Sequence, residues 1–182
     1  MTETQHKYAV KANNNDDLTD TFRLLLHCAI GDDLASLGAI KLIVKGYPAA
    51  LSAPFDGLLP IQMACGSKIS GLVKYLVELE GSSIELEDMN GNNLLHLACK
   101  SGNCGAVKYL LEKCAPLASL ENKEGMLPVH LLSDNSGKDE AVLESKEYTE
   151  TIWRLLLAHP ATVSSALDSN RSHKRMRVSA AH

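Results

Sequence analysis

Several signatures of common protein classes are missing from this chain. No run of about 18 uncharged apolar residues occurs, and the start, MTETQHKYAVKANNNDD, lacks the basic-then-apolar layout of a secretory signal. The five cysteines are odd in number and show no CxxC spacing, which argues against a disulfide framework and a zinc knuckle. We therefore expect an intracellular protein, cytoplasmic or nuclear, with reduced thiols and no membrane partner.

Motifs of catalysis are missing as well. The sequence contains no glycine-rich phosphate loop, no Gly-x-Ser-x-Gly elbow and no His-Glu-x-x-His pair. We expect no enzyme and no cofactor.

Acidic and basic residues are unevenly placed. The formal net charge is −4, all acidic residues lie at or before Asp168, and four basic residues follow it: Arg171, Lys174, Arg175 and Arg177. An acidic body is a poor surface for nucleic acid, so we expect no nucleic-acid partner. A partner with a basic or mixed apolar surface fits this charge better.

The chain repeats itself with a period of 34 residues. The segments LVKYLVE, 72–78, and AVKYLLE, 106–112, share five of seven letters at that offset. The same offset relates two sets of single residues: Gly57, Gly91 and Gly125, and Gln62, His96 and His130. A repeat of this length is typical of stacked supersecondary units.

One unit can be interpreted in physical terms. Residues 88–91 form a turn, Asn93 can cap a helix over 94–100, and a second helix over 104–113 places apolar residues on one stripe. Pro116 then ends that helix, and we expect an extended segment after it. Each unit is therefore predicted to be turn, helix, turn, helix.

The segments FDGLLPIQMAC, MNGNNLLHLAC and KEGMLPVHLLS resemble the ankyrin repeat, whose consensus is roughly Asp-x-x-Gly-x-Thr-Pro-Leu-His-x-Ala-Ala. The resemblance implies an all-α solenoid of about four helix-turn-helix repeats with short finger-like turns or hairpins. The expected units are 17–53, 54–87, 88–121 and 122–167, the last with an insertion near 134–147. Residues 1–16 and the basic tail 168–182 are expected to be disordered.

The repeat signature assigns a structural role to eight residues: Gly57, Pro60, Gln62, Gly91, His96, Gly125, Pro128 and His130. Because glutamine takes the place of histidine in one unit, a shared metal-binding role for this position is disfavoured. The resemblance implies that this histidine ties the start of the helix to neighbouring backbone. A remote alternative is a metal or redox protein using His96, Cys99 and Cys104, the last with a pKa lowered by its helix dipole.

The resemblance implies a non-catalytic protein-interaction module, a scaffold or adaptor, that binds through finger tips and the concave helix face as a monomer. Candidate contacts are Phe55, Asp56, Leu58, Met89, Asn90, Asn92, Lys123, Glu124 and Met126 on fingers, and Ser67, Lys100, Ser101 and Asn103 at helix ends. Phe55, Leu58, Met89 and Met126 are the expected apolar anchors, unless they pack on adjacent fingers. The alternative function is a nuclear regulatory protein imported through the HKRMR patch of its tail.

Overall fold

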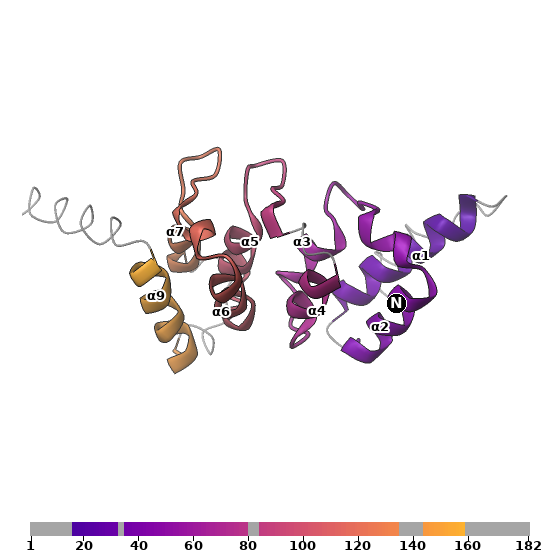
Figure 1. Ribbon diagram of the computed structural model, residues 1–182, viewed down its shortest axis with the longest axis horizontal. Helices are drawn as coiled ribbons and strands as arrows, with labels where there is room; N and C mark the ends of the chain where they lie inside the picture. The colour runs from indigo at the N-terminus through magenta and orange to yellow at the C-terminus, as the bar shows by residue number, and fades with distance from the viewer. Residues whose placement is uncertain (1–15, 33–34, 80–83, 135–143, 159–182) are drawn as a thin grey trace, which may run out of the picture.

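The computed structural model describes residues 16–32, 35–79, 84–134 and 144–158, and it is a row of stacked helix pairs (Figure 1). The described helices are α1 (Asp16–Gly31), α2 (Leu37–Gly46), α3 (Pro60–Ala64), α4 (Leu72–Leu79), α5 (Leu94–Ser101), α6 (Cys104–Lys113), α7 (Pro128–Ser133) and α9 (Lys146–Ala158). Three finger loops project from the same edge of the row (Figure 1). The predicted all-α solenoid is confirmed.

One apolar cluster runs through all the units. The second helix of unit three buries Val107 and Leu110 completely, as the helical spacing predicts. Leu111 and Cys114, which belong to the same predicted stripe, are half-buried and pack against the cluster. The core is therefore continuous along the stack, and each unit buries its apolar stripes against its neighbours.

The described helices start in two ways. Asn93 caps α5: its Oδ1 accepts from the N–H groups of Leu95 and His96 at 3.0 and 3.1 Å. Pro60 and Pro128 are the first residues of α3 and α7, where the missing N–H costs nothing. Gly102 ends α5 with φ 72°, a left-handed conformation that favours glycine.

The segments after two of the second helices are not extended, which corrects the prediction. They form 3₁₀ helices, η2 (Pro48–Ser52) and η4 (Ala115–Ser119), each with proline at its start. Proline ends the preceding α-helix yet fits the first turn of a new one, because its fixed φ is helical. Leu117 and Ala118 of η4 are buried, so the segment contributes to the core.

Unit two is built with less helix than unit three. Gly66 stands where Lys100 lies in α5, and α3 ends at Ala64 after five residues. Ile69 stands where Asn103 caps α6, and its side chain has no atom that can accept a hydrogen bond. Both differences shorten or weaken the helix ends at the border between units two and three.

Three predictions concern residues outside the described ranges. These are the disorder expected of 1–15, most of the insertion, 135–143, and the basic tail with its import patch, within 159–182. In the part of the chain that the structure describes, no helix has the length and apolar character needed to cross a membrane.

Candidate protein-interaction surface

In unit three the repeated histidine links the start of its helix to the next finger. The Nδ1 of His96 accepts from the Asn93 N–H at 3.3 Å, and its Nε2 donates to the Met126 carbonyl at 2.9 Å. His27 reaches the Leu58 carbonyl in the same way, at 3.2 Å. Burial lowers the pKa of His96, although the Met126 carbonyl and nearby carboxylates oppose the shift. His96 therefore ties the start of α5 to neighbouring backbone, which is the role that the resemblance implies.

Gln62 fills the histidine position in unit two. Its Oε1 accepts from the Leu59 N–H at 2.8 Å, which is the bond that His96 makes through Nδ1. His130 accepts likewise from the Leu127 N–H at 3.1 Å, but its side chain is exposed at the end of the stack. The position therefore serves helix capping in units two, three and four.

Finger three is organised around Asp88. One carboxylate oxygen accepts from the N–H groups of Asn90 and Asn92, both at 2.8 Å. The other accepts from the Asn92 side-chain amide at 3.0 Å. Partial burial would raise the pKa of Asp88, but these bonds and the charge of Lys100 outweigh it and lower the pKa. The finger is thus fixed by an ionised side chain at its base.

Finger four is bonded directly onto finger three. Asn122 closes its own finger by accepting from the N–H groups of Glu124 and Met126, and donates to the Asn92 Oδ1 at 2.8 Å. Lys123 donates its N–H to the Asn90 carbonyl at 3.0 Å. We call residues 88–92 and 122–126 together the finger plate, because side-chain and backbone bonds join them into one surface.

Finger two lacks these bonds for a reason visible in the sequence. Pro54 and Leu58 stand where finger three has Asp88 and Asn92, so neither side chain can accept or donate. The turn is closed by backbone bonds between Phe55 and Leu58 at 2.9 and 3.1 Å. The Phe55 ring lies against the His27 ring, with centroids 5.4 Å apart.

The predicted finger contacts differ in exposure. Met89 is 77% exposed, and four polar residues are also exposed: Asp56, Asn90, Lys123 and Glu124. Three expected apolar anchors are half-buried: Phe55, Leu58 and Met126. Asn92 is only 4% exposed, which corrects its assignment as a contact. Its amide bridges Asp88 and Asn122, so its role is to join two fingers.

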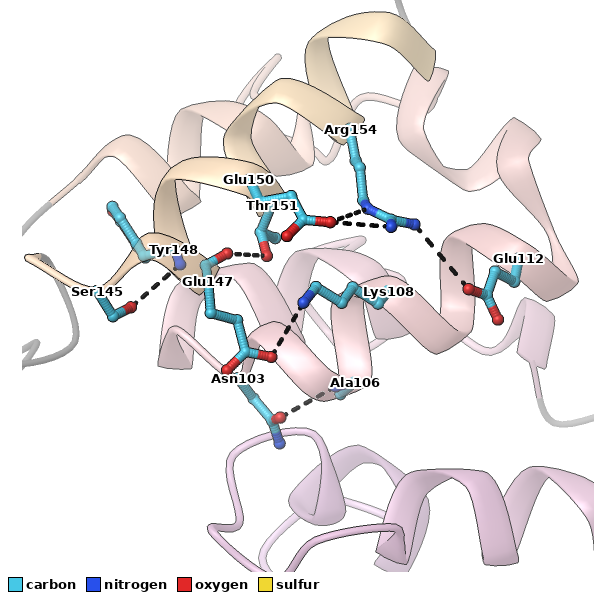
Figure 2. A network of polar contacts seen from close by, with 10 residues as sticks. All are labelled: Asn103, Ala106, Lys108, Glu112, Ser145, Glu147, Tyr148, Glu150, Thr151 and Arg154. Atoms are coloured by element: carbon cyan, nitrogen blue, oxygen red, sulfur yellow. Dashed lines mark hydrogen bonds and ion pairs between the residues drawn. The ribbon is translucent and has the colours of Figure 1, made fainter.

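Two of the four helix-end candidates also have structural roles. The Ser101 hydroxyl donates to the Cys65 carbonyl at 2.8 Å. The Asn103 amide donates to the carbonyls of Cys65 and Ser67 at 3.2 and 2.9 Å, while its oxygen caps α6 by accepting from the Ala106 N–H (Figure 2). Ser101 and Asn103 therefore join units two and three, Ser67 is half-buried, and Lys100 remains exposed.

A cleft at the border between units two and three was not predicted. Its volume is about 260 Å³, and it lies between residues 67–74 and the first turns of α6. Ile69 and Tyr109 are among its lining residues, and the Tyr109 hydroxyl is buried without a hydrogen-bond partner. The missing cap at Ile69 was the available signal in the sequence.

The three residues of the remote alternative, His96, Cys99 and Cys104, are all buried. Cys104 is 7% exposed, and burial raises its pKa, so the expected lowering by the helix start is wrong. Burial raises the pKa of Cys65 to about 12. Within the described ranges, no three His, Cys, Asp or Glu side chains are grouped to hold a metal ion.

Comparison with known families agrees with this geometry. A family model described as ankyrin repeats (3 copies) matches residues 7–119 and 61–144, which together cover more than half of the chain. No curated protein gives a significant match.

Proposed function

Because the chain belongs to the ankyrin-repeat family, whose repeats are in general protein-interaction modules and typically non-catalytic, we propose that it binds a protein partner through its finger plate. Met89 is the apolar anchor of this proposal, and the exposed residues Asn90 and Glu124 contribute the surrounding polar contacts.

The observation that carries the proposal is an exposed apolar side chain on a rigid support. The Met89 carbonyl accepts from the Lys123 Nζ at 2.7 Å, and the neighbouring Asn90 is bonded to both Asp88 and the Lys123 N–H. The backbone that carries Met89 therefore loses little conformational freedom when a partner binds. Scattered apolar side chains are common on protein surfaces, so the hydrogen-bonded support distinguishes Met89, and its exposure alone does not.

The concave face offers a second contact area beside the plate. Met63, Leu97 and Leu131 occupy one position of the repeat at intervals of 34 residues, and all three are half-buried. They form a partly accessible apolar row along the first helices of units two to four. A partner that covers both areas presents apolar residues to Met89 and this row, and its basic groups match the acidic body of the chain.

The test is affinity capture from lysate followed by mass spectrometry, using the wild type, Met89→Glu and Leu42→Glu. Leu42 is the matched control, because it is 71% exposed and lies on α2 at the far end of the stack (Figure 1). We expect Met89→Glu to reduce recovery of the main partner by about tenfold or more, and Leu42→Glu to leave it unchanged. Equal recovery with both variants, or equal loss, contradicts the assignment to the finger plate. Met126→Glu is unsuitable, because Met126 is half-buried and its carbonyl accepts from His96.

A further inference from the structure

The tip of finger three carries a chemically reactive pair of residues. Asn90 is exposed and is followed by Gly91, and this is the only Asn-Gly pair of the chain. Glycine has no Cβ, so no side chain shields its backbone nitrogen from the side-chain amide of the asparagine before it. The Asn90 amide is therefore open to attack by the backbone of its own chain.

We propose that Asn90 is a site of spontaneous deamidation, and that the bonds between fingers three and four control its rate. In the first step the Gly91 nitrogen bonds to the Asn90 Cγ and the bond from Cγ to Nδ2 breaks. The Nδ2 group leaves as ammonia after taking up the proton that Gly91 loses, and a cyclic imide remains. Water then opens the imide at either carbonyl, which yields aspartate or isoaspartate. Water is the only co-reactant, and nothing is oxidised or reduced.

The folded turn opposes the first step. The Gly91 N–H donates to the Asp88 carbonyl at 3.0 Å, so the attacking nitrogen is already engaged in a hydrogen bond. On the other side of the pair, the Asn90 N–H donates to the Asp88 Oδ1 at 2.8 Å. Attack requires the Gly91 nitrogen to leave its bond, so the rate follows the population of the open turn.

Finger four holds this turn closed. The Asn90 carbonyl accepts from the Lys123 N–H at 3.0 Å, and the Asn122 amide donates to the Asn92 Oδ1 at 2.8 Å. The two backbones are also close, since a Cβ placed on Gly91 lies 3.1 Å from the Lys123 nitrogen. Opening of the turn therefore breaks bonds between the two fingers, and deamidation of Asn90 reports on the joint between units three and four.

The equivalent residue of finger four indicates what each product does. Glu124 takes the place of Asn90 and makes the same local bond, from its N–H to the Asn122 Oδ1 at 3.0 Å. A carboxylate on an ordinary main chain is thus compatible with this kind of finger. Isoaspartate lengthens the main chain by one atom, which displaces the Asn90 carbonyl from Lys123. Either product adds a negative charge to the finger plate, whether or not a partner binds there.

The test is peptide mass spectrometry of the full chain after incubation at mildly alkaline pH. It detects the conversion of amide to acid at Asn90 and separates the isoaspartyl peptide by its retention. The samples are folded wild type, Asn92→Leu and Gly57→Ala, together with wild type in urea, where the turn is open. We expect conversion about tenfold faster or more in urea and in Asn92→Leu than in folded wild type. Gly57→Ala is the matched control, because it strains finger two and removes no hydrogen bond of finger three, so it should keep the wild-type rate.

Each outcome decides the proposal. Absence of conversion at Asn90 in urea, or faster conversion at another asparagine there, overturns the assignment of the site. Equal rates in folded wild type and in urea overturn the control by the fold. Equal acceleration by Gly57→Ala and Asn92→Leu overturns the control by the joint, because the reaction then follows global unfolding. The urea comparison uses the wild type alone, so it tests the proposal even if Asn92→Leu fails to fold.

Discussion

Two borders in the stack have the same repeat register but different hydrogen bonds. They are the border between units three and four and the border between units two and three. The first is joined at the fingers, where Asn92 and Asn122 meet and Lys123 donates to finger three. The second is joined at the opposite ends of the helices, through Ser101 and Asn103, and leaves a cleft of about 260 Å³ between α4 and α6. A regular period in sequence therefore does not imply uniform joints in the stack.

A few side chains account for this difference. Finger two has Pro54 and Leu58 where finger three has Asp88 and Asn92. It therefore cannot continue the side-chain hydrogen bonds that join fingers three and four, which we call the ladder. Its contact with finger three is apolar: the position of a Cβ on Gly57 lies 3.6 Å from the Met89 methyl carbon. An apolar contact is less directional than a bonded one, so we expect fingers three and four to move as one body.

The largest effect is expected from Asn92→Leu, which gives finger three the residue of finger two. The substitution leaves the Asn122 amide and one Asp88 oxygen without the bonds they make to Asn92. Unsatisfied buried polar groups cost about 1–3 kcal/mol each, so we expect a loss of about 2–4 kcal/mol in the free energy of unfolding, measured by urea titration.

Leu58→Asn is the reciprocal control for that experiment. Pro54 stands at the place of Asp88 and offers the new amide no side-chain partner within finger two, and Leu58 is half-buried, so the substitution should cost about 1 kcal/mol or less. If both substitutions lower stability equally, the ladder does not distinguish the two borders.

A smaller difference is expected between two glycine substitutions. Gly57 and Gly91 have φ of 78° and 73°, so alanine is strained at both, by about 1–2 kcal/mol. A Cβ at Gly91 also lies 3.1 Å from the Lys123 backbone nitrogen, whereas at Gly57 it meets the flexible Met89 side chain. We expect Gly91→Ala to cost about 1 kcal/mol more than Gly57→Ala in the same titration. A larger loss at Gly57 would mean that finger two is the more constrained of the two.

The sequence predicts the fold and most of the helix ends, because the signals involved are local. Asn93 acts within one turn of its own position, and its prediction as a helix cap is correct. The 3₁₀ helices after α2 and α6 were missed, since proline was considered only as the end of one helix.

The candidate surface is less predictable because it depends on contacts between units. Asn92 is expected to be a contact residue because the resemblance places it on a finger, but its partners Asp88 and Asn122 belong to two different fingers and bury it. For Cys104 the helix start indicated a lowered pKa, and burial against neighbouring helices reversed the sign. Comparing the finger positions pair by pair would have shown that unit two lacks the ladder, since Pro54 and Leu58 are visible in the sequence.

The smallest effect should come from His96→Gln, which makes unit three resemble unit two, where Gln62 already fills this position. Because burial lowers the pKa of His96, the unfolded chain binds the proton more readily. The stability of the fold with a neutral, buried His96 is therefore fully present above the usual histidine pKa of about 6.5. It is lost as the pH falls below that value. We expect the free energy of unfolding of His96→Gln to stay within about 1 kcal/mol of wild type at pH 8, and its loss of stability between about pH 7 and 5 to be smaller than that of the wild type.

Asp88 titrates at lower pH and does not interfere. His130→Gln is the matched control, because it makes the same substitution at an exposed residue of the same repeat position. An unchanged slope in His96→Gln would show that the buried histidine does not set the pH dependence of the joint.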